Sequence, residues 1–525
     1  MITIRMYNVG LGDCFLLRFK APGRERDRFM LIDCGLFRGS DAEKETLQAV
    51  VEDIAKTTKG RLDVVVATHE HQDHLSGFWY AQAIFKEKIK IDKVWLAWTE
   101  RPGEPRARQL KDKIDQFSDQ LTETVNRLGI HLDETKPVNN RRQFSVHALQ
   151  SVGSVLDFLG FDTDDSVPQN APTNPPTVVE QPPKKKLSIN RKALNYLQEV
   201  AVPPENIVYH EPDTITTLDG LPNIRVYILG PPRSDLIKQS DPSKRDPEVY
   251  NFAGNDRSNY AMMLPAWSGN EEEDRLDQLD RMPFEPVYYT SAEAVRIPVD
   301  TFTDDEETVK RKVFFQHYYT NEKDERNFDQ GHRKIDDDWL FSLGNLALQL
   351  DGDTNNTSLA LAIELIDTKR VLLFPGDAQV GNWLSWHDCK WEHPDTKDVT
   401  TAKLLERTVF YKVGHHGSHN ATLRDKGLEL MQSPDLVAMI PLDEAVAKQK
   451  DWKMPFGSLY ASLAIKTKGR ILQADGILSP AAVEAAKLRT EDDEQAYTSA
   501  VKHSKARRPT ANNIDRPLWT EFILR

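Results

Sequence analysis

Short apolar runs that end in turn residues divide the first hundred residues into strands. Four runs read in this way, because apolar segments of this length bounded by Gly, Asp or Asn are typical of β-strands. They are residues 2–9, 14–19, 29–35 and 62–69. Between the last two, apolar positions at helical spacing over 47–54 follow Ser40 and Glu43, which have the spacing of a capping box. The pattern predicts strands alternating with helices, an α/β fold.

The same pattern returns after about Leu340. Five further segments read as strands with punctuated ends, namely 355–365, 369–379, 407–422, 434–442 and 469–476. Between the two α/β blocks, helical spacing runs from Leu110 to Leu128 with a stop at Gly129, and 223–232 reads as a strand. We expect two blocks separated by inserted chain.

Composition excludes some classes of protein. The 525 residues are 39% hydrophobic and 28% charged, with 68 Lys and Arg against 81 Asp and Glu, a net charge of −13. A uniformly basic surface for non-specific binding of polyanions is thereby excluded. Three widely spaced cysteines argue against a disulfide scaffold and fit a reducing compartment. No stretch reaches the roughly 18 apolar residues of a membrane span, and the N-terminus reads as strand and turn. We expect a cytoplasmic protein with no membrane association.

The strongest chemical signal is THEHQDHLSG, residues 68–77, directly after a predicted buried strand. It contains His69, His71, Asp73 and His74. Imidazole nitrogens and carboxylate oxygens suit zinc, iron or manganese. The alternative is a polar solvated loop, but three of the chain's 14 histidines and an acid within six residues favour metal binding.

Two further motifs follow predicted strands. Asp377 stands in LLFPGDAQ, where an acid after Pro-Gly could by itself be a turn residue or a helix cap. His415 and His416 stand in VGHHGSH, and a surface loop is the alternative there. The three motifs together are more specific than any one of them.

At this point the sequence resembles the metallo-β-lactamase superfamily, and within it the hydrolase domain of ComEC-type competence proteins. The resembling segments are NVGLGDCFLL (8–17), LIDCG (31–35), HEHQDH (69–74), ILGPP (228–232), NNTSLAL (355–361), FPGD (374–377), HHGS (415–418), MPFGSLYASL (454–463) and ILQADG (471–476). The resemblance implies a four-layer αβ/βα sandwich with metals at strand ends between two sheets.

The resemblance also implies a division of the chain with two large insertions. Residues 1–100 form the first half of the fold, 101–204 a helical insertion with a Pro-rich linker at about 164–186, 205–234 a strand returning to the core, 235–340 an acidic insertion, 341–480 the second half, and 481–525 a C-terminal helix, basic segment and final strand.

The implied cofactor is a pair of divalent metal ions, Zn²⁺ or Mn²⁺. His69 and His71 would hold the first ion, Asp73 and His74 the second, and Asp377 would bridge both. One of the tandem histidines would complete the second position. His415 is favoured because it lies nearer the strand end, but the sequence does not decide. The other would contact substrate.

Catalytic roles are expected for Asp73, His416 and Ser418. Expected substrate contacts are Gly417, Ser418, His419, Asn420, Asn356 and Ser358. By contrast, Gly10, Gly12 and Asp13 read as a tight structural turn near the site.

One feature departs from the superfamily, where a further metal-binding histidine is usual between the first motif and the bridging acid. The histidines noted in that interval, His147, His210, His317 and His332, read as surface or packing residues. We therefore expect either that the first metal is weakly held or that water or substrate completes its position, with Asn356 and Ser358 shaping that corner.

The predicted activity is metal-dependent hydrolysis by a phosphodiesterase or nuclease that uses a metal-bound hydroxide at a two-metal site. The alternatives are hydrolysis of a small phosphodiester, a lactone or a thioester by the same fold, and a scaffold for protein interaction. The resemblance implies nucleic acid, DNA in particular, as a partner. Basic clusters at 184–192 and 501–509 are compatible with phosphate contacts, and solubility or a flexible tail is the equal alternative for each cluster. A protein partner would bind through the insertions, and the oligomeric state stays open.

Overall fold

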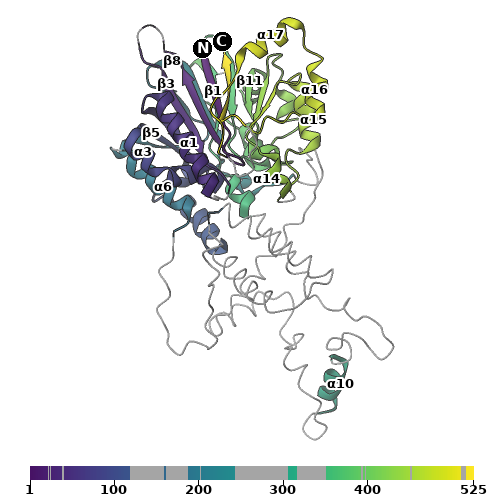
Figure 1. The fold of residues 1–525 in the computed structure, drawn as a ribbon. Coiled ribbons are helices and arrows are strands. Elements are labelled where there is room, and N and C mark those ends of the chain that lie inside the picture. Colours follow the sequence, from purple (N-terminus) through teal and green to yellow (C-terminus); the bar gives the residue numbers. More distant parts are fainter. Residues whose placement is uncertain are drawn as a thin grey trace. The chain divides into compact units, whose positions relative to one another are not determined.

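The computed structural model describes residues 1–118 except 22, 24 and 38–40, residues 159–160, 187–242 except 202, 305–315, 350–449 except 392, 393 and 397, 452–509, and 516–525. The chain splits into two compact units. The first comprises Met1–Ser118, Val155–Asp256 and Gln349–Arg525, and it contains both sheets (Figure 1). The second comprises Asp119–Ser154 and Arg257–Leu348, of which helix α10 (Glu306–Phe315) is described.

The first sheet has eight strands in the order β14-β15-β1-β2-β3-β4-β5-β6. The strands from β14 to β3 pair antiparallel and those from β3 to β6 pair parallel. Their bounds are β1 Ile2–Tyr7, β2 Cys14–Phe19, β3 Arg28–Cys34, β4 Arg61–Val66, β5 Lys90–Ala97, β6 Ile207–His210, β14 Val501–His503 and β15 Trp519–Leu524.

The second sheet has seven strands in the order β13-β12-β11-β10-β9-β8-β7. Here β10 to β13 pair parallel, and β7 to β10 pair antiparallel. The bounds are β7 Ile215–Leu218, β8 Leu221–Gly230, β9 Ala360–Leu365, β10 Arg370–Phe374, β11 Thr408–Lys412, β12 Val437–Ile440 and β13 Ile471–Gln473.

Three apolar cores define four layers. Since side chains alternate between the faces of a strand, Met30 and Ile32 of β3 join a core shared by both sheets, while Phe29 and Leu31 join a core under the helices of the first half. A third core lies between the second sheet and its own helices. The order is therefore helices, sheet, sheet, helices, the predicted αβ/βα sandwich.

The helices are short apart from the first. On the first sheet they are α1 Asp41–Thr58, α2 Gln72–Tyr80, α3 Gln82–Lys88 and α6 Ile189–Val200, and residues 105–118 are also helical. In the second half they are α12 Val380–Trp386, α13 Thr401–Glu406, α14 Glu444–Gln449, α15 Gly457–Lys466, α16 Pro480–Ala486 and α17 Glu491–Ala500. Single 3₁₀ turns are η1 Trp98–Glu100, η2 Pro204–Asn206, η3 Asp235–Lys238, η8 Pro394–Thr396, η9 Gly414–Gly417 and η10 Leu428–Leu430.

Most predicted strands and the helix after Glu43 are confirmed, with ends shifted by a few residues. One boundary differs more, because 350–355 are helical and β9 begins only at Ala360. Asn356 explains this, since its side chain bonds backbone groups of Gln239, Gln379 and Asn382 instead of letting its segment join the sheet. The helix expected over 110–128 is seen to residue 118, and its remainder, Gly129, Ser40 and the Pro-rich linker lie outside the described residues.

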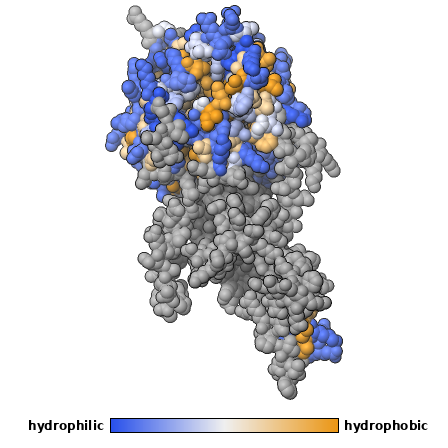
Figure 2. All heavy atoms as spheres, turned by 45° about the vertical axis from the view of Figure 1, so that its right-hand side comes forward, coloured by the Kyte–Doolittle hydropathy of each residue, from blue (hydrophilic) through white to orange (hydrophobic). Residues whose placement is uncertain are grey.

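The surface of the first unit is mostly polar, with apolar side chains gathered on one face (Figure 2). Exposed apolar residues on or beside α15 and α16 are Ile465, Leu478, Val483 and Leu488. Among the described residues, no helix combines the length and apolarity needed to cross a membrane. All three cysteines, Cys14, Cys34 and Cys389, are free thiols.

Candidate metal centre

The three predicted motifs meet at the strand ends between the two sheets. Residues 68–74 follow β4 of the first sheet, while Asp377 follows β10 and His415 and His416 follow β11 of the second. Parallel strands bring their carboxyl ends to one edge of a sheet, and here an edge of each sheet contributes.

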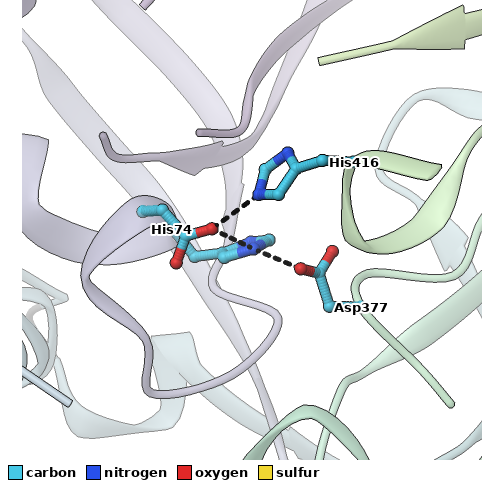
Figure 3. Close-up of side chains that lie close together, drawn as sticks. His74, Asp377 and His416 are labelled. Carbon is cyan, nitrogen blue, oxygen red and sulfur yellow. Dashed lines mark hydrogen bonds and ion pairs between the residues drawn. The ribbon is translucent and has the colours of Figure 1, made fainter. Parts of the chain in front are cut away.

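Four buried side chains form the centre of this site. Asp73, His74, Asp377 and His416 each place one ligand atom within 4.8 Å of the other three. His74 Nε2 lies 3.2 Å from Asp377 Oδ2, and His416 Nε2 lies 2.8 Å from Asp73 Oδ2. Figure 3 shows His74, Asp377 and His416 converging from opposite sides of the site. The cluster has the donor set of a divalent cation site.

His69 and His71 form a second group beside the cluster. His69 Nε2 lies 3.0 Å from His71 Nδ1, and both residues are about 2% exposed. The other ring nitrogen of His69 lies 3.1 Å from Thr68 Oγ1 and 3.2 Å from Ser358 Oγ. The hydroxyls fix the His69 ring, so that its Nε2 faces His71.

Asp33, at the end of β3, holds His74 in place. Its carboxylate accepts hydrogen bonds from the Thr68 backbone N at 2.8 Å and the Thr68 hydroxyl at 2.7 Å, and it lies 2.8 Å from His74 Nδ1. Donation from Nδ1 to Asp33 fixes the tautomer that leaves the Nε2 lone pair for a metal. Asp33 has a φ of 56°, an uncommon conformation for a residue other than glycine. The sequence gives no sign of this role, because Asp before a Cys-Gly turn reads as turn chemistry.

Asp33→Asn is expected to lower metal affinity about 10- to 100-fold without loss of fold, the usual cost of removing a partner that orients a ligand histidine. Asparagine tolerates the left-handed backbone at this position, so the change keeps the backbone while it removes the charge and one of the two acceptor oxygens. Competition with a chromophoric chelator measures the affinity. Asp367→Asn, at an exposed turn, is the control, and an affinity within threefold of wild type would contradict the role given to Asp33.

Lys412, the last residue of β11, is a buried cation inside the site that the sequence did not predict. Its Nζ lies 2.5 Å from Asp13 Oδ2 and 2.9 Å from Asp377 Oδ1, and it donates to the Gly376 carbonyl. Asp377 Oδ1 also accepts from the His415 backbone N at 2.9 Å. One oxygen of Asp377 is thus held by the protein, while the other, Oδ2, turns towards His74. Asp13, which the sequence assigned to a structural turn, therefore contacts the site as well.

Residues 415–417 form a run of left-handed backbone. The φ values are 43° for His415, 53° for His416 and 81° for Gly417. Two consecutive non-glycine residues in this region store strain of about 1–3 kcal/mol each, which packing must offset. The run lets the His415 N–H reach Asp377 while the His416 ring enters the cluster, its Nδ1 2.7 Å from the Pro441 carbonyl. The structure thus places His416 in the four-residue cluster, and His415 Nδ1 lies 3.0 Å from the Ser418 hydroxyl instead.

Protonation states reflect an excess of buried carboxylates. Burial alone would lower the pKa of His74, but Asp377, Asp73, Asp13 and Asp33 raise it well above its ordinary value. Burial lowers the pKa of His71 to about 4 despite Asp73, and burial with the charge of His74 lowers the pKa of His69. Burial would raise the pKa of Asp377, but Lys412 and His74 hold it well below its usual range.

The site fits divalent metal ions. Asp73 Oδ1 is fully buried and has no hydrogen-bond partner among the described residues, and the buried atoms His74 Nε2 and Asp377 Oδ2 lie 3.2 Å apart without hydrogen-bond geometry. Buried polar atoms are normally paired. A cation would satisfy all three atoms and replace the proton that the carboxylates favour on His74.

Comparison with known families agrees with this geometry. Residues 7–145 match the family model described as metallo-beta-lactamase superfamily. The fold is a metallo-beta-lactamase fold. Because most members of the superfamily are metallo-hydrolases, the match implies a metal-dependent hydrolase. The match is to the superfamily as a whole, and no curated protein matches the chain.

In this metallo-beta-lactamase fold, several of the residues that were predicted to contact substrate instead form hydrogen bonds within the protein. Asn356 is fully buried and bonds to backbone groups. Ser358 Oγ accepts from the Asp377 backbone N at 3.0 Å and lies beside His69, so it positions two proposed ligands. Ser418 donates to Asn420 at 2.9 Å, and Asn420 donates to the Ser240 carbonyl. His419 is about a third exposed and lies 3.7 Å from Asp241.

The predicted basic clusters are partly used inside the metallo-beta-lactamase fold. Arg191 Nε lies 2.9 Å from Glu70 Oε1, and Arg508 Nη1 lies 2.9 Å from Asp443 Oδ2. Lys502 and Lys505 are exposed, and residues 184–186 lie outside the described part. Any nucleic-acid contact by the described part of these clusters would depend on exposed side chains such as Lys502, Lys505 and Arg507.

Proposed function

We propose that this protein is a two-metal phosphodiesterase, with nucleic acid as the first polymeric substrate to test. The observation that carries the proposal is the buried set Asp73, His74, Asp377 and His416 beside the pair His69 and His71. The negative charges of Asp377 and Asp73 both raise the pKa of His74, and both oppose the lowering of the pKa of His71 by burial. Asp377 is accordingly the proposed bridge, with His69 and His71 on the first ion and Asp73, His74 and His416 on the second.

The surrounding residues orient these ligands before any substrate binds. Lys412 and the His415 N–H hold Asp377 Oδ1, Asp33 holds His74 Nδ1, and the Pro441 carbonyl lies against His416 Nδ1. With Nδ1 engaged, His416 has its Nε2 lone pair for a metal and is not free to transfer a proton. His415 is then the tandem histidine left for substrate, which reverses the order favoured by position along the strand.

Two divalent ions held here would supply a nucleophilic water of lowered pKa and a clamp for the charge of an in-line displacement. The choice of a phosphodiester rests on the resemblance of the motifs at 8–17, 69–74 and 415–418 to ComEC-type hydrolase domains. Burial lowers the pKa of His415 to about 4, so it is neutral at pH 7. Ser418 gives its hydroxyl proton to Asn420, so the one N–H of neutral His415 donates from Nδ1 to Ser418, and its Nε2 would accept a hydrogen bond without adding charge.

His416→Ala is expected to lose one of two bound ions. His415→Ala should keep both and lower kcat/KM about 10-fold, within the roughly 0.5–1.5 kcal/mol that one neutral hydrogen bond contributes. Metal content after equilibrium dialysis and steady-state kinetics measure the two effects. Loss of an ion in His415→Ala with retention in His416→Ala would reverse the assignment.

The decisive experiment is hydrolysis of bis(4-nitrophenyl) phosphate and of single- and double-stranded DNA, with Zn²⁺ or Mn²⁺ supplied and with chelator. We expect cleavage that requires metal and is lost in Asp73→Asn, with the same circular dichroism spectrum as wild type. Parallel assays use a lactone and a thioester. Hydrolysis of these alone would favour the second candidate, another metallo-hydrolase activity of this fold. Absence of bound metal and of all hydrolysis would favour a scaffold.

The choice between Zn²⁺ and Mn²⁺ stays a prediction. The protein partner bound through the insertions and the cytoplasmic location also stay predictions. The acidic insertion at 235–340 lies mostly outside the described residues.

A further inference from the structure

A chain of hydrogen bonds links His415, the tandem histidine outside the four-residue cluster, to the start of the acidic insertion. Its Nδ1 lies 3.0 Å from the Ser418 hydroxyl, which donates to Asn420 Oδ1 at 2.9 Å. The amide Nδ2 of Asn420 donates to the Ser240 carbonyl at 3.1 Å. The chain therefore runs from a backbone carbonyl through two side chains to the imidazole.

The Ser240 carbonyl sets the direction of every bond in this chain. A carbonyl oxygen only accepts, so it faces the NH₂ group of Asn420, and a second acceptor, Asp241 Oδ1, lies 3.5 Å from the same group. The amide oxygen of Asn420 then faces Ser418 and takes its single hydroxyl proton. A lone pair of Ser418 is left for His415, so the ring proton of His415 lies on Nδ1.

The anchor of this chain is itself held by the fold. The neighbouring carbonyl of Gln239 accepts from the Gly381 backbone N at 2.7 Å and from Asn356 Nδ2 at 2.8 Å. Ser240 and Asn420 are only 5% and 7% exposed, so water has little access to the bond between them. The direction of the chain is therefore fixed before any substrate binds.

The other ring nitrogen of His415, Nε2, is then an acceptor, because a neutral imidazole has one N–H and burial favours the neutral ring. No residue in the described part of the chain is hydrogen-bonded to Nε2, and the ring centroid lies 6.1 Å from that of His416 in the cluster. The oxygens of a phosphodiester carry no proton at pH 7 and cannot donate to an acceptor. A water molecule or a sugar hydroxyl can.

We propose that Asn420 is a positioning residue that acts through Ser418 and makes His415 Nε2 the acceptor for an O–H group at the metal centre. That group is the attacking water or a sugar hydroxyl of the substrate, and His415 does not bind the phosphate. The inference rests on the proposed function and adds the kind of group that meets His415 during hydrolysis.

The tautomer of His415 can be observed directly in the full chain. Protein labelled with ¹⁵N-histidine is studied by long-range ¹H–¹⁵N NMR with and without Zn²⁺, and the signal missing in His415→Gln identifies His415. We expect the Nδ1–H form in wild type. In Asn420→Ala the Ser418 hydroxyl can donate to Nδ1, so the Nε2–H form should be populated. Asn223→Ala, at an exposed position of β8, is the control and should keep the wild-type signal.

A second pair of variants keeps the test decisive if Asn420→Ala does not fold. Ser418→Thr retains the hydroxyl and should keep the Nδ1–H form, whereas Ser418→Ala should lose this preference. Wild type in the Nε2–H form would overturn the proposal. So would an Nδ1–H form that persists unchanged in Asn420→Ala, or in Ser418→Ala where that variant is used.

Kinetics distinguish the two sources of the O–H group. A ribodinucleotide and the matching deoxyribodinucleotide are compared in wild type, His415→Ala, Asn420→Ala and the double variant. Each single change should lower kcat/KM about 10-fold, and the double variant should lose no more, because both changes remove the same bond. A loss confined to the ribodinucleotide assigns the bond to the sugar hydroxyl, and an equal loss with both substrates assigns it to the attacking water. Losses that multiply in the double variant would contradict the proposal.

Failure of the proposed function is distinguishable, since the tautomer is read without turnover. Wild type in the Nδ1–H form that responds to Asn420→Ala but cleaves no phosphodiester contradicts the proposed function and supports the role of Asn420. Cleavage by a protein whose His415 is in the Nε2–H form contradicts the role of Asn420 alone.

Discussion

Asp377→Asn is expected to lower kcat/KM for phosphodiester hydrolysis by about three orders of magnitude or more, or about 4 kcal/mol of transition-state stabilisation. Asp377 Oδ2 faces His74 Nε2 at 3.2 Å, while Oδ1 is fixed by Lys412 and the His415 N–H. The amide of asparagine carries no negative charge with which to bridge two cations. Its NH₂ group would also face one of the donors that the carboxylate accepts from, either Lys412 and the His415 N–H or His74 Nε2. Both metal positions should therefore weaken together.

Steady-state kinetics and metal analysis on the same preparation check this prediction. Asp388→Asn, an exposed acid just after α12, is the matched control and should leave both quantities unchanged. Activity within tenfold of wild type, or loss of only one ion at unchanged affinity for the other, would contradict the bridging role.

The second large effect concerns Lys412. Lys412→Met should destabilise the metal-free protein by about 3–5 kcal/mol, because it leaves the carboxylates of Asp13 and Asp377 buried without their counter-charge. Metal bound at the site would offset part of this charge, so the loss should be smaller in the loaded protein. Urea denaturation with chelator and with saturating Zn²⁺ measures the two values.

Asp13→Asn combined with Lys412→Met should recover part of the lost stability, since one of the two stranded charges is then removed. Lys487→Met, at an exposed i,i+3 pair with Glu484, is the control and should change the free energy of unfolding by under about 1 kcal/mol. An equally small change in Lys412→Met would refute the structural role of this lysine.

Sequence patterns sufficed for the strands that carry chemistry. Apolar runs with punctuated ends locate β3, β4, β10 and β11 to within a few residues, and parallel pairing brings the ends of β3 and β4 together in one sheet and those of β10 and β11 together in the other. That the ends from the two sheets meet was implied by the resemblance to the metallo-β-lactamase superfamily and not by strand pattern.

The residues that support the site could not be predicted in this way. Lys412 reads as the polar end of an apolar strand. Its burial depends on ion pairs with Asp13, near the start of the sequence, and with Asp377, which follows the preceding strand, so local sequence does not indicate it. Arg191 and Arg508 lie in basic clusters of the sequence, where nothing in the pattern indicates the internal ion pairs that they form with Glu70 and Asp443. The sequence pattern does not show which of two adjacent histidines enters the site. The left-handed backbone at His415 and His416 turns the two side chains in different directions, and this conformation is seen only in the structure.

The position of β15 has a consequence for the order in which the molecule can be assembled. Residues 519–524 pair with β1 along its whole length, and in Figure 1 the marked ends N and C lie side by side. Before those residues are synthesised, β1 has a bare edge of unpaired N–H and C=O groups, which is a template for association with other chains. The nascent chain must therefore keep β1 from pairing wrongly until β15 is made, and a truncation before Trp519 should yield aggregates rather than a shorter folded protein.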